Sequence, residues 1–106
     1  MKEIIYDKLV RDKIPEIIEA SGKKCEVEIL DDARYIEKID SKLDEELAEY
    51  HADQSIEELA DLLEVIYAAA EARGYTIAQL EEIRQSKAAK RGRFQQKILL
   101  KKVIED

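Results

Sequence analysis

The chain has 106 residues, of which 45% are hydrophobic and 41% charged, and a formal net charge of −7. This length suits one domain with a modest core, and no apolar run is long enough for a membrane-spanning helix. The acidic balance argues against binding to nucleic-acid polymers, although a bound cation can still reverse the local field for a nucleotide. Because Cys25 is the one cysteine, no internal disulfide can form, and we expect a cytoplasmic protein without a membrane partner.

The N-terminal region predicts a short helix between two β-like segments. Residues 4–6 are β-like, and residues 25–30 alternate apolar and acidic side chains as a half-buried strand does. We expect the two segments to pair as a small ribbon, which would need helices to pack against because two strands alone are marginally stable. The helix between them is expected to begin at an Asp12 cap and to end at Gly22.

Three long helices are predicted in the remainder of the chain. We expect them at residues 33–52, 55–73 and 77–91, with Asp32, Ser55 and Thr76 as their N-caps. Thr76 and Gln79 match a capping box, and Gly92 is expected to end the last helix. The short polar break between the first two suits an αα-hairpin, and residues 95–106 are expected to form an extended arm. The predicted fold is therefore mainly α: an antiparallel bundle of three long helices plus the short one, with a small β-ribbon, in a single domain spanning residues 1–106.

Two acidic pairs stand on either side of the predicted hairpin turn. Glu46 and Glu49 are three residues apart on the first helix, and Glu58 and Asp61 on the second. A turn centred between residues 53 and 54 brings the pairs to matching heights, where like charges repel unless a cation lies between them. All-oxygen ligands suit Mg²⁺ or Mn²⁺. The alternatives are a solvated acidic face and, for Glu58, a capping box with Ser55.

The second long helix predicts self-association. Ten of the twelve residues from Leu59 to Ala70 are apolar or aromatic, so the helix must be covered on several sides. A chain of this length has few other helices to cover it. A second copy is the simplest source of cover, and we expect a homodimer or homotetramer that associates through helices.

Cations gather at two places in an otherwise acidic chain. Arg11 and Lys13 flank the start of the short helix, where they are either solvated or salt-bridged charges or phosphate contacts. A second group follows the last helix and would either complement the helix dipole or bind phosphate. Its members are Lys87, Lys90, Arg91 and Arg93.

Three motifs together resemble a known family. Glu45-Glu46-x-x-Glu49 followed by Glu58-x-x-Asp61 resembles the EExxE…ExxD signature of the MazG-like, all-α nucleoside triphosphate pyrophosphatases. The segments KLVRDKIP at residues 8–15 and KRGRF at residues 90–94 look like a branch related to phosphoribosyl-ATP pyrophosphohydrolase. The eight residues between Glu49 and Glu58 are fewer than in larger MazG domains, which removes part of a loop that could shape a base pocket.

The resemblance implies an enzyme that cleaves a nucleotide between its α- and β-phosphates with Mg²⁺, giving a monophosphate and pyrophosphate. It also implies a set of metal ligands, which are Glu46, Glu49, Glu58 and Asp61, with Glu45 as a nearby helper. On chemical grounds, Glu45 or Glu49 would orient the attacking water. The two groups of cations are candidates to stabilise the leaving pyrophosphate.

Two functions of different class remain open at this point. The first is the pyrophosphohydrolase, acting either on unwanted nucleotides or on phosphoribosyl-ATP in histidine synthesis. The second is a non-catalytic helical module that dimerises and binds a partner through a solvated acidic face. The sequence offers no support for a cysteine nucleophile, because Cys25 lies on a strand-like face and His51 is not evidently beside it.

Overall fold

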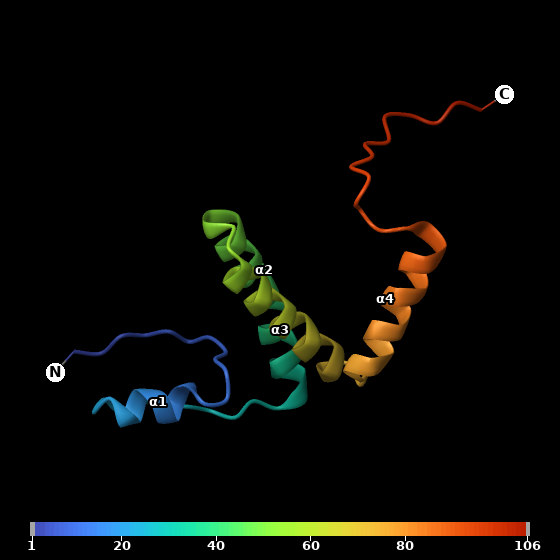
Figure 1. Cartoon of the computed structure of the whole chain (residues 1–106). Coiled ribbons are helices and arrows are strands. Elements are labelled where there is room, and N and C mark those ends of the chain that lie inside the picture. Colours follow the sequence, from blue (N-terminus) through green and yellow to red (C-terminus); the bar gives the residue numbers. More distant parts are fainter. Residues whose placement is uncertain (1, 106) are drawn as a thin grey trace. The chain divides into compact units, whose positions relative to one another are not determined.

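A computed structural model describes residues 2–105, which hold four helices and no strand (Figure 1). The helices are α1 (Ile14–Ala20), α2 (Asp32–Asp53), α3 (Ile56–Ala72) and α4 (Ile77–Arg91). The predicted mainly α class is confirmed, and each long helix begins and ends within one residue of its predicted bounds. None of the helices in the described part of the chain has the length and apolar character needed to cross a bilayer.

The chain forms two compact units. The first ends at Tyr75 and contains α1, α2 and α3, whereas the second begins at Thr76 and contains α4 and the C-terminal segment. In the first unit α2 and α3 pack side by side as an antiparallel αα-hairpin (Figure 1). This hairpin is the scaffold on which the acidic residues are placed.

The hairpin turn is tight because only two residues separate the helices. Gln54 ends α2 in the left-handed conformation, with φ 59° and ψ 26°, and its N–H donates to the carbonyl of Tyr50. Ser55 then begins α3, and its hydroxyl accepts from the backbone N–H of Glu58 at 3.3 Å. A left-handed C-cap is common at helix ends but favours glycine over a residue with a side chain.

Two of the predicted caps are displaced by one residue. Lys13, not Asp12, is the N-cap of α1, and no side chain caps that helix. Asp31, not Asp32, caps α2, and its side chain accepts from the N–H of Arg34 at 2.9 Å. Asp31 has the extended conformation that a capping side chain needs, with φ −73° and ψ 169°, whereas Lys13 has helical angles, with φ −91° and ψ −4°. The capping box of Thr76 with Gln79 at the start of α4 is confirmed.

The predicted β-ribbon is absent from residues 2–105. Residues 4–6 and 25–30 are both irregular. Ile5 is 81% exposed and Ile29 93% exposed, so no apolar layer covers either segment. Two strands without such a layer are marginally stable, which accounts for the missing ladder. The C-terminal segment from Gly92 to Glu105 likewise contains neither helix nor strand.

A single chain buries few of its side chains. Among the described residues only Ile39 and Glu46, both on α2, are buried, with 5% and 7% of their surface exposed. On α3, Leu59 and Leu63 remain 43% and 46% exposed. Leu47 on α2 is also 43% exposed. The apolar side chains that the sequence offers therefore exceed what one copy of the hairpin can cover.

Candidate metal centre

The structure gathers the predicted acidic residues into two overlapping groups at the hairpin. One group is Glu45, Glu46 and Glu49 on α2, and the other joins Glu46 to Glu58 and Asp61 on α3. Within each group, one carboxylate oxygen from every residue lies within 4.8 Å of the others. Glu46 belongs to both groups, so it links the two helices. We call these five residues the acid cluster.

Two oxygens of the acid cluster are buried without a hydrogen-bond partner. They are Oε2 of Glu46 and Oε2 of Glu58. The side chain of Glu46 is only 9% exposed, and its other oxygen lies 3.5 Å from the ammonium of Lys42. A buried oxygen without a partner costs about 1–3 kcal/mol, and such groups call for an explanation such as an ion. The converging oxygens and the two without partners fit a hard divalent cation.

Burial and mutual repulsion raise two pKa values in the cluster. Loss of hydration on burial raises the pKa of Glu46, and the neighbouring charge of Glu49 raises it further. The pKa of Glu58 is raised by the same loss of hydration and then by the charges of Glu49 and Asp61. A cation at this position would favour the ionised forms and reverse both shifts.

Glu45 has the opposite environment because two lysines hold it. Lys8 Nζ lies 2.8 Å from Glu45 Oε1, and Lys42 Nζ lies 3.3 Å from the same oxygen. The hydrogen bond from Lys8 is the main reason that the pKa of Glu45 is lowered, and the same contact raises the pKa of Lys8. Glu45 is therefore held as a carboxylate beside carboxyl groups that are biased towards protonation.

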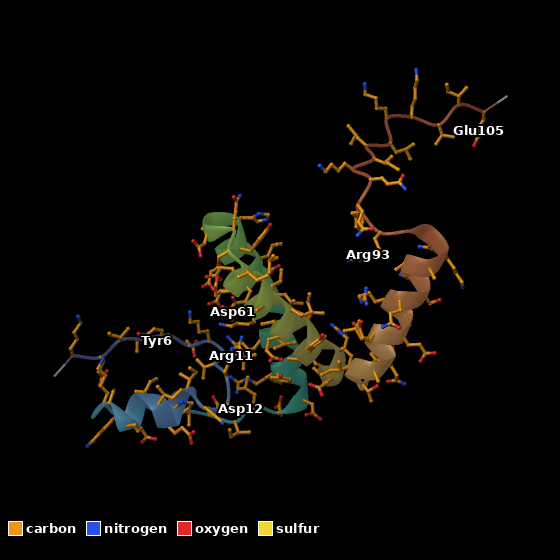
Figure 2. The ribbon with its side chains drawn as sticks, in the orientation of Figure 1. Tyr6, Arg11, Asp12, Asp61, Arg93 and Glu105 are labelled. Atoms are coloured by element: carbon orange, nitrogen blue, oxygen red, sulfur yellow. The ribbon has the colours of Figure 1, made fainter. Side chains whose placement is uncertain are left out.

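The N-terminal segment reaches both helices of the hairpin. Besides the contact of Lys8 with α2, Arg11 Nη2 lies 2.7 Å from Asp61 Oδ1 on α3, and its Nη1 lies 3.7 Å from Glu64 (Figure 2). Of the two alternatives for Arg11, the salt bridge is found, with Asp61 of the acid cluster, and its role as a phosphate contact stays a prediction. The Lys8 and Lys42 contacts were not singled out from the sequence. Lys42 could have been found from its position three and four residues before Glu45 and Glu46.

The other predicted cations are not brought to the acid cluster by any described contact. Lys13 is exposed at the start of α1. The remaining four belong to the second unit and are all exposed, with two of them in the last turn of α4, where they complement the helix dipole. They are Lys87, Lys90, Arg91 and Arg93. Their role as phosphate contacts stays a prediction.

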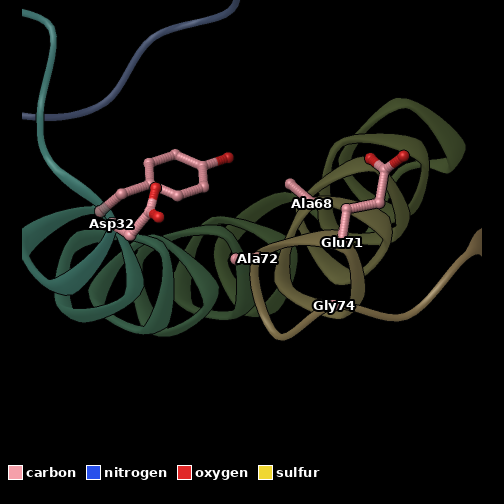
Figure 3. A pocket seen from close by; sticks show the side chains of 6 residues that line it. Asp32, Ala68, Glu71, Ala72 and Gly74 are labelled. Atoms are coloured by element: carbon pink, nitrogen blue, oxygen red, sulfur yellow. The ribbon is translucent and has the colours of Figure 1, made fainter.

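An open cavity of about 450 Å³ lies between the start of α2 and the end of α3 (Figure 3). Its lining combines the ring of Tyr35 and two alanines with the carboxylates of Asp32 and Glu71. It is at the end of the hairpin remote from the Gln54 turn, and no residue of the acid cluster lines it. It is therefore a separate feature from the candidate metal centre.

Comparison with known proteins gives little functional information. No protein-family model matches the chain, and no solved structure matches it. An uncharacterized protein of Mycolicibacterium smegmatis is 52% identical over 44 residues. That match covers 42% of this chain and 45% of the relative, so the chain matches less than half of the length of that protein.

Proposed function

We propose that the protein is a Mg²⁺-dependent nucleoside triphosphate pyrophosphohydrolase of the MazG-like type, with Mn²⁺ as a possible substitute. The observation that carries the proposal is the convergence of Glu46, Glu58 and Asp61 from two helices, with two buried oxygens that lack partners. An acidic face made only for solvation would expose these oxygens to water instead. The resemblance of the acidic motif supplies the reaction class.

The charge of the site supports one divalent cation. The acid cluster contributes five carboxylates, and Lys8, Arg11 and Lys42 are the three cations paired with them. Five negative and three positive groups leave a formal charge of −2, which one Mg²⁺ neutralises. We assign Glu46, Glu49, Glu58 and Asp61 as its ligands, and phosphate oxygens of the substrate would complete the shell.

The reaction proposed is the attack of water on the α-phosphorus. Bound Mg²⁺ would polarise the phosphoryl group and acidify the water. The chain supplies Glu45 or Glu49 to accept the water proton. Lys8 and Lys42 hold Glu45 in place at the cluster, and their positive charges also make it a weaker base. The bond from the α-phosphorus to the bridging oxygen breaks, and pyrophosphate leaves with that oxygen. Cations near the site stabilise the charge that develops on it.

A second candidate function follows from the exposed apolar side chains of α3. A helical module that pairs with a second copy or another protein would cover Leu59 and Leu63, whether or not it has activity. We propose that the enzyme itself is a homodimer or homotetramer associated through this surface. Unwanted nucleoside triphosphates and phosphoribosyl-ATP are both candidate substrates.

Pyrophosphate release separates these functions. A panel of nucleoside triphosphates and phosphoribosyl-ATP would be incubated with the full chain and Mg²⁺ or Mn²⁺. We expect release by the wild type, its loss in Glu46→Gln, and its retention in Asp44→Asn, a matched change at an exposed acid of the same helix. Absence of release from every substrate, with the fold intact by circular dichroism, would favour the binding module.

A further inference from the structure

A small cavity between the N-terminal segment and α2 is rich in lysine. It has a volume of about 70 Å³ and is lined by Lys8, Lys38 and Lys42, by Ser41, and by Asp7, Leu9 and Glu45. We call it the lysine cavity. A water molecule takes about 30 Å³ in the liquid, so the cavity has the size of a small oxyanion. Such a concentration of cations is unusual in a chain whose net charge is −7.

The helix and the N-terminal segment each contribute to the lysine cavity. On α2, Lys38, Ser41, Lys42 and Glu45 follow the spacing that puts side chains on one helix face. Lys8 comes from the opposite wall, directly after Asp7, whose φ of 47° marks a turn in the chain. Three lysine side chains from two segments therefore line one cavity.

The charges in the cavity are unevenly paired. Lys8 and Lys42 contact Glu45, whereas Lys38, which is half-buried, makes no ion pair within residues 2–105. The hydroxyl of Ser41 donates to the carbonyl of Glu37 at 3.2 Å, so the lysines are the source of positive charge. Glu45 also belongs to the acid cluster, which makes the lysine cavity and the candidate metal centre direct neighbours.

We propose that the lysine cavity is an anion site for the terminal phosphates of a nucleoside triphosphate. The inference rests on the proposed function, and it gives the substrate a direction: the reacting phosphorus lies at the acid cluster, and the β- and γ-phosphates extend towards Lys8, Lys38 and Lys42. A divalent cation held by Glu46 would compete with Lys42 for that carboxylate, whereas Lys38 has no ion-pair partner among residues 2–105 and is available to phosphate oxygens without any such change. The cations of α4 are not needed for this contact.

Calorimetric titration with inorganic pyrophosphate in the presence of Mg²⁺ tests the anion site without turnover. Lys38→Gln is the informative variant, because this lysine lines the cavity but contacts no acid of the cluster. Lys24→Gln is the matched control, since it makes the same charge change at an exposed position outside the cavity. We expect Lys38→Gln to weaken pyrophosphate binding by about tenfold or more, the effect of losing one charge-assisted hydrogen bond, and Lys24→Gln to leave it unchanged.

Three results would overturn the assignment. They are no binding of pyrophosphate to the wild type, equal affinity in Lys38→Gln and the wild type, and equal losses in both variants, which would reflect net charge alone. Circular dichroism would confirm that the variants fold. Competition then identifies the group that occupies the cavity. An α,β-methylene triphosphate should displace pyrophosphate and a monophosphate should not, and displacement by both would contradict the assignment to terminal phosphates.

Failure of this inference and failure of the proposed function give different results. If pyrophosphate binds through Lys38 and no nucleotide is cleaved, the anion site stands and the hydrolase is wrong. If nucleotides are cleaved and Lys38→Gln changes neither pyrophosphate affinity nor KM, the hydrolase stands and the anion site is wrong.

Discussion

Replacement of Glu46 by glutamine should separate the stability of the metal-free protein from its response to metal. The carboxylate is 9% exposed at its side chain, one of its oxygens has no partner, and the charge of Glu49 lies beside it. Glutamine removes the buried charge and its repulsion with Glu49, and its amide can donate where a carboxylate oxygen can only accept. We take the gain as about 1 kcal/mol, the low end of the cost of a buried polar group without a partner. In a domain of this size 1 kcal/mol corresponds to about 4–8 °C in Tm. We therefore expect metal-free Glu46→Gln to melt about 4 °C or more above the wild type.

In excess Mg²⁺ the wild type should melt at a higher temperature than Glu46→Gln. A cation held at about one hundred times its Kd stabilises the folded state by about 2.7 kcal/mol, and Glu46→Gln loses a ligand shared by both acidic groups. Thermal unfolding followed by circular dichroism, in EDTA and in excess MgCl₂, measures both effects, with Asp44→Asn as the control. A metal-free variant less stable than the wild type, or an undiminished Mg²⁺ shift, would refute the reasoning about Glu46.

Three further predictions concern the same unit. The folded-state pKa values of Glu46 and Glu58 are raised, so their contribution to the stability of the metal-free protein is present below about pH 4.5 and is lost as the pH rises through those values. Urea unfolding in EDTA between pH 4 and 7 should therefore show a free energy of unfolding that declines with pH. A rise would contradict the prediction. Gln54→Gly should raise the free energy of unfolding in urea by up to about 1 kcal/mol, because the φ of 59° at Gln54 is unfavourable for a residue with a Cβ atom and is tolerated by glycine. A lower free energy of unfolding would exclude strain at the turn. Arg11→Met should tighten Mn²⁺ binding about 1.5- to 5-fold in calorimetry, because the exposed ion pair of Arg11 with Asp61 competes weakly with the metal for that carboxylate. Weaker Mn²⁺ binding would show instead that Arg11 supports the metal.

The helices could be predicted because their signals are local. Thr76 and Gln79 form the expected capping box, and Gly92 ends α4 with a φ of 83°. The approach of Glu46 to Asp61 across the hairpin followed from a short turn and the helical repeat alone. These features depend on residues close in sequence, so a reading of spacing is sufficient to find them.

The contacts of the N-terminal segment could not be predicted in this way. Lys8 and Arg11 lie in an irregular stretch and reach partners 37 and 50 residues away. No periodicity relates an irregular segment to a helix that distant, so the pairing of Lys8 with Glu45 had no local signal. The prediction of a β-ribbon was wrong for a related reason. The alternation of residues 25–30 is a local pattern, but a strand needs an apolar layer to pack against, and this unit does not provide one.

The burial of the Glu46 carboxylate is unfavourable for folding and favourable for the proposed metal site. In the described chain it is one of two buried residues, and the other is Ile39, seven residues earlier on α2. A hydrophobic residue of similar volume at this position would avoid the loss of carboxylate hydration and would make the contact with α3 more stable. A hairpin with so small a core gains no stability from a carboxylate there unless an ion compensates for it. Packing alone does not account for the position of Glu46, and we propose that a cation bound by the acid cluster does.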